Sequence, residues 1–264
     1  MPHATSQDGT SIAYDLTGDG PPVILVGGGL VDPVTGRAGR WENAPLAAEL
    51  ATRFSVWNYD RRGRADSGDT PPYAVERELE DLDALIAAAG GSAHAYGVSS
   101  GGALALEAAA AGLAIDRLAV YEVPYMVGDE AAARWRGYVD DLGPALAEGR
   151  RGDAVELFMR VAGASEEGIA GARRSPMWAS LEAIAHTLAY DAACLGDGLP
   201  PTGRLAAIAQ PVLVATGGGD EFFELAGDAI AASVPGAQRL TIERQGHLAD
   251  PKVVAPVLER FFAD

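Results

Sequence analysis

The chain has 264 residues, of which 48% are hydrophobic, and this is enough apolar material for one sizeable core. Its 37 acidic and 20 basic residues give a formal net charge of −17, so its long-range field repels phosphate backbones and argues against nucleic acid as a partner. Cys194 is the single cysteine of the chain, which excludes an internal disulfide and a cysteine-rich metal site.

The N-terminal residues and the apolar stretches indicate where the protein is located in the cell. Residues 1–9 contain neither a basic segment nor an apolar run, so we expect no secretory signal and a cytoplasmic protein. The longest apolar stretches, such as residues 23–26, are far shorter than the roughly 20 residues that span a bilayer. We therefore expect no membrane span and no membrane partner.

Strand and helix patterns alternate along the first half of the chain. Residues 11–16 alternate in polarity after an Asp8-Gly9 turn, which predicts the second arm of an N-terminal hairpin. The apolar run 23–26 ends at a glycine run, a pattern typical of a strand buried on both faces of a parallel sheet. Helices are then predicted at 46–51, 75–89 and 102–111, and strands at 54–60, 93–98 and 118–121.

The second half interrupts this alternation and then resumes it. Between residues 124 and 205 the pattern is helical only, with predicted helices at 130–148, 153–162 and 177–193; strands at 211–216 and 239–242 and a helix at 253–262 follow. Alternating strands and crossover helices predict an α/β fold with a mostly parallel central sheet and helices on both faces. We expect a core domain of residues 1–123 and 206–264, a helical cap of residues 124–205 inserted in it, and an active site beyond the carboxyl ends of the strands.

The most informative motif is Gly-Val-Ser-Ser-Gly at 97–101, which matches G-x-S-x-G between a predicted strand and an alanine-rich helix. The serine of this motif sits on a strained turn, where side chains two residues before and after it would collide with backbone. Ser100 is the rival nucleophile, but it would put Val98 and Gly102 at the two crowded positions, and valine fits poorly there. We therefore predict Ser99 as the nucleophile.

With this motif the chain resembles the α/β-hydrolase fold superfamily of serine hydrolases, from the N-terminal hairpin to the last helix. In that family the catalytic residues follow the order nucleophile, acid, histidine, and the histidine follows the final strand. His247 comes after the predicted strand 239–242 and matches the Gly-His of the family, so the resemblance implies that it is the general base. His3, His94 and His186 are interpreted as surface or packing residues, with substrate contact as the alternative for His186.

The resemblance also implies an acid after a late strand. Asp220 lies just beyond the strand 211–216, and its task would be to accept the second ring N–H of His247 and to stabilise the imidazolium. The alternative role for Asp220 is to cap the helix that follows. Glu221 is adjacent, and Glu122 occupies a second position, directly after the strand before the cap, where some members of the fold carry their acid.

An oxyanion hole needs two backbone N–H groups. The resemblance implies that Ser100, directly after the nucleophile, supplies one of them. The family takes the other from the loop after its third strand, usually behind a His-Gly pair. In this chain Gly27 and Gly28 stand at that pair, which leaves Gly29 as the donor and Leu30 as the alternative, unless the loop is only a flexible turn.

Residues 60–67, Asp-Arg-Arg-Gly-Arg-Ala-Asp-Ser, resemble the D-x-R-G-x-G-x-S segment of the family, with Ala65 in place of a glycine. We interpret this segment as structural, with charges that fix loops. The alternative is that Arg61 or Arg62 is exposed in the pocket and binds a substrate carboxylate.

The resemblance implies a serine hydrolase that cleaves an ester, lactone or related acyl substrate through an acyl-enzyme, without metal or cofactor. A serine nucleophile disfavours the alkyl-enzyme chemistry of haloalkane dehalogenases and epoxide hydrolases. Aromatic and methionine side chains in the cap favour a small hydrophobic molecule as the partner, unless they only pack the cap onto the body. Two alternatives stay open, a ligand-binding protein with a vestigial triad and a non-hydrolytic lyase or cofactor-free oxygenase, and so does the oligomeric state.

Overall fold

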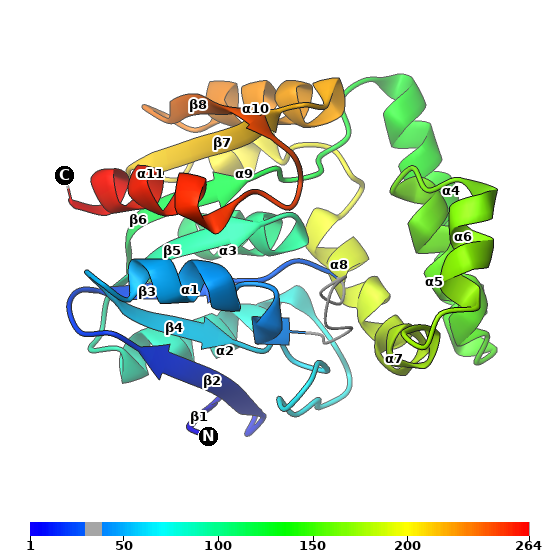
Figure 1. The fold of residues 1–264 in the computed structure, drawn as a ribbon, viewed down its shortest axis with the longest axis horizontal. Coiled ribbons are helices and arrows are strands. Elements are labelled where there is room, and N and C mark those ends of the chain that lie inside the picture. The colour runs from blue at the N-terminus through cyan, green and yellow to red at the C-terminus, as the bar shows by residue number, and fades with distance from the viewer. Residues whose placement is uncertain (30–38, 264) are drawn as a thin grey trace.

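The computed structural model describes residues 1–29 and 39–263, and these contain an eight-stranded sheet in the order β1-β2-β4-β3-β5-β6-β7-β8 (Figure 1). β1 (His3–Thr5) and β2 (Ser11–Thr17) form the predicted antiparallel hairpin at one edge, and β2 pairs antiparallel with β4. All later neighbours pair in parallel. These are β3 (Pro22–Val26), β4 (Ser55–Tyr59), β5 (Ala93–Val98), β6 (Ile115–Tyr121), β7 (Val212–Gly218) and β8 (Gln238–Gln245).

Helices cover both faces of the sheet, which confirms the predicted fold class. Successive side chains of a strand point to opposite faces, and β3 shows both halves of the core: Ile24 and Val26 pack on one side, Val23 and Leu25 on the other. The first side is covered by α2 (Val75–Ala88), α3 (Ser100–Ala110) and α10 (Glu221–Ser233), and the second by α1 (Ala44–Leu50) and α11 (Pro251–Ala263). None of the helices in the described chain combines the length and the apolar character of a bilayer span.

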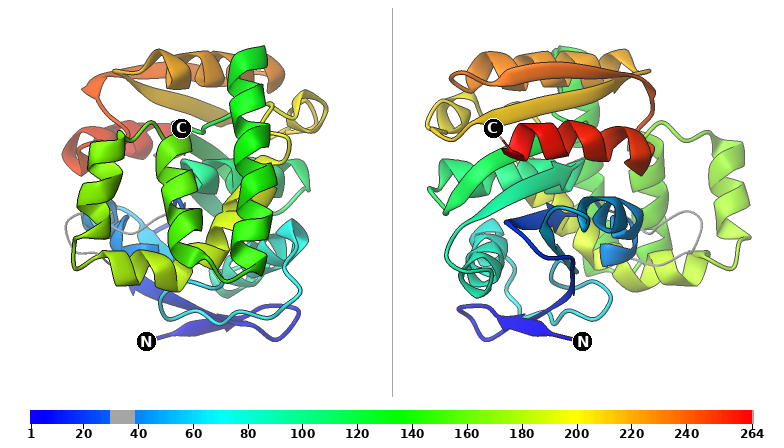
Figure 2. Two further views of the ribbon diagram at one scale, coloured as in Figure 1. Left: turned by 90° about the vertical axis from the view of Figure 1, so that its right-hand side faces the viewer. Right: turned by 60° about the vertical axis from the view of Figure 1, so that its left-hand side comes forward.

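Residues 122–211 are all described, and between β6 and β7 they form helices and no strand. Figures 1 and 2 show α4 to α7 standing to one side of the sheet, with α8 between them and the body. The helices of this insertion are α4 (Asp129–Ala147), α5 (Arg151–Val161), α6 (Glu166–Arg173), α7 (Trp178–Ile184), α8 (Leu188–Leu195) and α9 (Thr202–Leu205).

The insertion differs from prediction in two respects: α6 and α9 are not among the predicted helices, and one predicted helix is divided. The helix predicted at 177–193 is split into α7 and α8 by a 3₁₀ turn, Ala185–Thr187. At the break the hydroxyl of Thr187, a fully buried residue, donates to the carbonyl oxygen of Ile184 at 2.8 Å and accepts from Arg64 at 3.3 Å. Contacts with a distant loop, which helical periodicity does not report, therefore redirect the chain.

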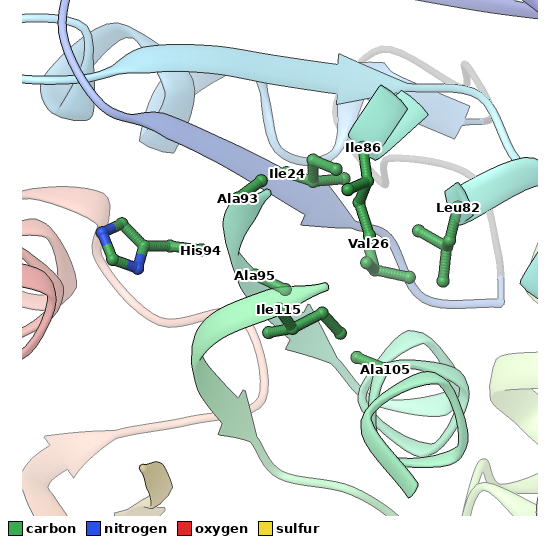
Figure 3. Close-up of a pocket in the computed structure, with 9 residues that line it drawn as sticks. All are labelled: Ile24, Val26, Leu82, Ile86, Ala93, His94, Ala95, Ala105 and Ile115. Atoms are coloured by element: carbon green, nitrogen blue, oxygen red, sulfur yellow. The ribbon is translucent and has the colours of Figure 1, made fainter. Parts of the chain in front are cut away.

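The void drawn in Figure 3 lies inside the body, between β3 and β5 on one side and α2 and α3 on the other. Its volume is about 10 Å³, room for about one water molecule. His94 points away from the other labelled side chains and stacks on Phe262 of α11, with ring centroids 4.9 Å apart. The void is a packing imperfection of the core, and His94 is a packing residue.

Burial predicts a large difference between two leucines on helices. Leu104 of α3 has no exposed surface, whereas Leu225 of α10 is 45% exposed. Leu104→Ala should lower the free energy of unfolding by about 2–5 kcal/mol, because it leaves a cavity. Leu225→Ala, the matched control, should change it by less than about 0.5 kcal/mol. Urea unfolding measures both, and equal losses would contradict this description of the core.

Candidate active site

Ser99 lies on the turn between β5 and α3, with φ 55° and ψ −131°, a conformation that is strained for any residue with a side chain. A Cβ at Gly97 would lie 2.7 Å from the carbonyl oxygen of Gly101, and a Cβ at Gly101 would collide with the carbonyl oxygen of Gly27. The N–H of Ser99 donates to the carbonyl oxygen of Tyr121 at 3.0 Å, which ties the turn to the end of β6. The turn therefore has the geometry and the glycine requirement that G-x-S-x-G predicts.

Ser100, the rival nucleophile, has a different environment. It is the first residue of α3 and is 4% exposed, and its hydroxyl donates to Asp191 Oδ1 at 2.8 Å. A hydroxyl held by a buried carboxylate is poorly placed to attack a substrate. The N–H groups in the first turn of a helix, by contrast, have no acceptor within the helix.

His247 lies in the loop between β8 and α11, where it is paired with a carboxylate. Its Nδ1 is 2.9 Å from Oε2 of Glu122, which is 3% exposed and directly follows β6 with a positive φ of 46°. The other oxygen of Glu122 accepts the N–H of Gly217 at 3.0 Å. The imidazole also stacks on the ring of Phe223, with centroids 4.8 Å apart and 11° between the planes.

The carboxylate hydrogen-bonded to His247 in the structure differs from the one that the sequence analysis predicts. Asp220 was expected there, but it is exposed and is the N-cap of α10, where its side chain accepts the N–H of Phe222 at 2.9 Å. Glu122, the second position considered, is buried against His247 instead. Both acids follow strands whose carboxyl ends meet at one edge of the sheet, so chain order alone does not separate them.

The loop after β3 passes directly beside Ser99. A Cβ at Gly28 would lie 3.2 Å from Cβ of Ser99, and a Cβ at Gly29 would lie 2.8 Å from Asp191 Oδ2. Gly29 thus lies in the loop that the family uses for the second oxyanion donor, close to the first turn of α3. Leu30, the alternative donor, lies outside the described residues.

Glu42, which the sequence analysis missed, lies against the loop after β3. Its Oε2 accepts the N–H of Gly28 at 3.1 Å. A Cβ at Gly27 would be in van der Waals contact with Glu42 and Asn43, so these side chains occupy the region next to the position where the family carries its histidine. Burial raises the pKa of the Glu42 carboxyl, and the Gly28 N–H lowers it in part. No motif marks Glu42, which precedes α1.

Arg61 and Arg62 are buried and paired with carboxylates. They are 2% and 1% exposed, and each forms a two-pronged pair with a carboxylate of α2. Arg61 pairs with Glu78 through two hydrogen bonds of 2.7 Å, and Arg62 pairs with Asp81 at 2.8 and 2.7 Å. These contacts agree with the interpretation of residues 60–67 as structural. They do not agree with the alternative in which Arg61 or Arg62 binds a substrate carboxylate.

His186 and His3 have separate environments. Nε2 of His186 lies 3.4 Å from Asp69, and its ring meets that of Tyr190 edge-on at 5.7 Å. His3 lies on the edge strand β1 and is exposed. His186 therefore packs on neighbouring side chains, and His3 lies at the surface.

The fold and this arrangement agree with a comparison against known families. The sequence profile of the alpha/beta hydrolase family matches residues 23–257. The chain belongs to the alpha/beta hydrolase family. Within this alpha/beta hydrolase, the strained serine turn and the loop that carries His247 lie inside the matched region.

Three similar proteins match this alpha/beta hydrolase over nearly its whole length. An alpha/beta hydrolase from Sphaerobacter thermophilus is 48% identical, with a TM-score of 0.87 and coverage of 99% of this chain and 100% of that one. A thermophilic esterase from Thermogutta terrifontis is 25% identical, with a TM-score of 0.69 and coverage of 99% and 97%. A pimeloyl-(acyl-carrier protein) methyl ester esterase from Xanthomonas campestris is 33% identical over 267 residues, which cover 94% of this chain and 98% of the relative.

The glycine requirement of the serine turn can be tested by substitution. Gly101→Ala should strongly destabilise the alpha/beta hydrolase, because its Cβ would collide with backbone oxygens of Gly27 and Val26 that cannot move away cheaply. Gly137→Ala on α4 is the control, since its Cβ would meet open space and alanine favours a helix by about 0.5–1 kcal/mol over glycine. Melting temperatures should fall for the first and hold or rise for the second, and an unchanged melting temperature for Gly101→Ala would refute the steric argument.

Proposed function

We propose that this alpha/beta hydrolase cleaves a carboxylic ester or a related acyl compound through an acyl-enzyme on Ser99. In this proposal His247 is the general base and Glu122 is the acid that orients it. The observation that carries the proposal is the 2.9 Å hydrogen bond between Glu122 and His247, on the same edge of the sheet as the strained turn of Ser99.

The chemistry follows from these positions. Oγ of Ser99 attacks the acyl carbon while Nε2 of His247 takes its proton, and Glu122 stays ionised and accepts the N–H at Nδ1. The imidazolium then gives the proton to the departing alkoxide, which leaves as an alcohol. Water activated by the same imidazole cleaves the acyl-enzyme and releases the acid.

Two further features support the proposal. The N–H groups of Gly29 and Ser100 would hold the oxygen of the tetrahedral intermediate, and Ser100 begins α3, where unpaired N–H groups and the helix dipole favour negative charge. The parallel stack of Phe223 on His247 restricts the tilt of the imidazole, so the ring keeps the direction in which Glu122 holds it.

We propose a small, apolar acyl substrate. Leu248 next to His247 is 64% exposed, and Phe222 and Phe223 are partly exposed at the start of α10, so the surroundings of the base are apolar. The net charge of −17 disfavours a strongly anionic substrate. Two of the similar proteins described above are named as esterases.

We further propose that α4 to α7 act as a cap over this substrate. Trp135, Tyr138 and Trp178 are between 5% and 9% exposed and pack within the insertion and against its neighbours. Their burial supports the interpretation that most aromatic residues of the cap pack its helices together. Partly exposed residues such as Phe158 and Met159 are better candidates for contact with substrate.

Covalent labelling tests the nucleophile. A fluorophosphonate probe should label the wild-type protein on the peptide that contains Ser99, and a panel of p-nitrophenyl esters and lactones should be turned over. Ser99→Ala should abolish labelling and lower kcat by a factor on the order of 10⁶, because no other group can form the acyl-enzyme. Ser92→Ala, at the half-buried residue directly before β5, is the control and should retain both. A wild-type protein that is not labelled, or that turns over cyanohydrins and no ester, would refute the proposal.

The two candidate acids, Glu122 and Asp220, can be distinguished by mutation. Glu122→Gln should lower kcat by about 10⁴, because an amide cannot hold the same tautomer or stabilise the imidazolium. Asp220→Asn should leave kcat and stability unchanged, since asparagine caps a helix as well as aspartate does. Steady-state kinetics on the best ester measures both. The opposite ranking would return the catalytic role to Asp220.

A further inference from the structure

A cluster of charged side chains is buried behind the serine turn and is not explained by the triad. Arg61 and Arg64 face Glu78 and Asp191, and all four side chains are at most 7% exposed. Two positive and two negative charges balance within the cluster. Burial alone raises the pKa of Asp191, but the two guanidinium groups and the hydroxyl of Ser100 outweigh it and hold that pKa below its ordinary value.

Arg64 joins the cluster to the loop beside Ser99. Its Nη2 donates to both oxygens of Asp191 at 2.8 and 2.7 Å, and its Nε donates to the hydroxyl of Thr187 at 3.3 Å. Its Nη1 donates to the carbonyl oxygen of Gly28. Every nitrogen of this buried guanidinium therefore has an acceptor, and one of these acceptors is a backbone carbonyl in the loop after β3.

The carbonyl of Gly28 and the N–H of Gly29 belong to one peptide unit. The carbonyl and N–H of a planar trans peptide point in opposite directions, so a hydrogen bond that fixes one fixes the other. Arg64 therefore determines where the N–H of Gly29 points, which is away from the buried cluster. We propose that Arg64, held in place by Asp191, is a positioning residue that orients the Gly29 donor of the oxyanion hole.

Asp191 acts on the second donor as well. Its Oδ1 accepts the hydroxyl of Ser100, the residue whose N–H is the other proposed donor, and its Oδ2 would lie 2.8 Å from a Cβ at Gly29. One carboxylate thus touches both halves of the proposed oxyanion hole. The absence of a side chain at Gly29 is what allows the approach.

The loop needs such external support because three consecutive glycines have no side chains to pack and few backbone restrictions. Glu42 holds the preceding peptide unit by accepting the N–H of Gly28. Arg64 holds the next unit through the carbonyl. Hydrogen bonds from two sides therefore replace the side-chain packing that the glycine run lacks.

The cluster also connects the hole to the insertion. Asp191 lies on α8, and Thr187 directly precedes that helix, whereas Arg64 belongs to the segment after β4. A shift of α8 would move Asp191, and with it the guanidinium that holds Gly28. The inference rests on the proposed function and adds that α8 sets the geometry of the oxyanion hole.

The test uses two buried arginines of the same loop. Arg64→Lys keeps the charge beside Asp191 but has no planar fork to hold Asp191 and Gly28 together. Arg62→Lys is the matched control, because Arg62 is equally buried but donates its hydrogen bonds to Asp81, Asp8, Ser6 and the carbonyl of Arg77, away from the loop after β3. Urea unfolding of both variants shows whether their losses of stability are comparable.

With p-nitrophenyl esters, Arg64→Lys should lower kcat by about 10²-fold and change KM by less than about threefold. The reason is that a misdirected donor stabilises the transition state less but hardly changes the binding of the substrate. Arg62→Lys should keep kcat within about threefold of wild type at a similar loss of stability. If Arg64→Lys does not fold, Asp191→Asn against Asp81→Asn makes the same comparison, with the same direction of effect. Equal kcat in both members of a pair would overturn the inference.

Failure of the inference is distinguishable from failure of the proposed function. A wild-type protein that the fluorophosphonate labels at Ser99, together with equal kcat losses in Arg64→Lys and Arg62→Lys, would remove the positioning role and leave the serine hydrolase intact. A wild-type protein that is neither labelled nor active on any ester would overturn both.

Discussion

The strained backbone at Ser99 is the constraint around which the rest of this end of the sheet is arranged. A residue with φ 55° persists only where its surroundings over-determine it. The turn is held by the end of β6 through Tyr121 and is closely approached by the loop after β3 at Gly27, so three neighbouring strands meet at one point. The glycine at 101 follows from this meeting, because a Cβ there would enter the backbone of the loop after β3; the glycine at 97 follows from the turn itself, because a Cβ there would lie 2.7 Å from the carbonyl oxygen of Gly101.

The stability of ion pairs does not by itself explain the buried charges behind the turn. Removing four charged groups from water costs several kcal/mol for each, and even a well-made pair regains this only in part. A buried ion pair is therefore weak support for stability as such, and replacement by apolar side chains is often neutral. What apolar side chains cannot do is direct a hydrogen bond at a backbone carbonyl. The placement of Arg64 between Asp191 and the carbonyl of Gly28 fits a requirement for direction better than a requirement for stability.

The parts of the molecule that could be predicted are those encoded in local pattern. Strands such as 93–98 and helices such as 75–89 appear in the sequence because each buries one apolar stripe or run, and Ser99 because its motif occupies five consecutive residues. The break at 185–187 and the contact of Arg64 with Asp191, 127 residues apart in the chain, could not be predicted, since neither leaves a periodic trace. The acid beside His247 falls between these cases: two candidates were visible, and only the packing at the sheet edge separates them.

That packing explains why the carboxylate comes from β6 and not from the loop after β7. A Cβ at Gly217, near the end of β7, would collide with the carbonyl oxygen of Gln245 at the end of β8 and lie 2.6 Å from the hydroxyl of Tyr121, so no side chain fits where the ends of β7 and β8 meet. Asp220 comes after this crowded point and is already committed to the start of α10. The end of β7 instead offers its backbone, because the N–H of Gly217 donates to the second oxygen of Glu122. With its other oxygen on His247, Glu122 is held between the end of β7 and the loop after β8, and these two hydrogen bonds account for a positive φ at a residue that is not glycine.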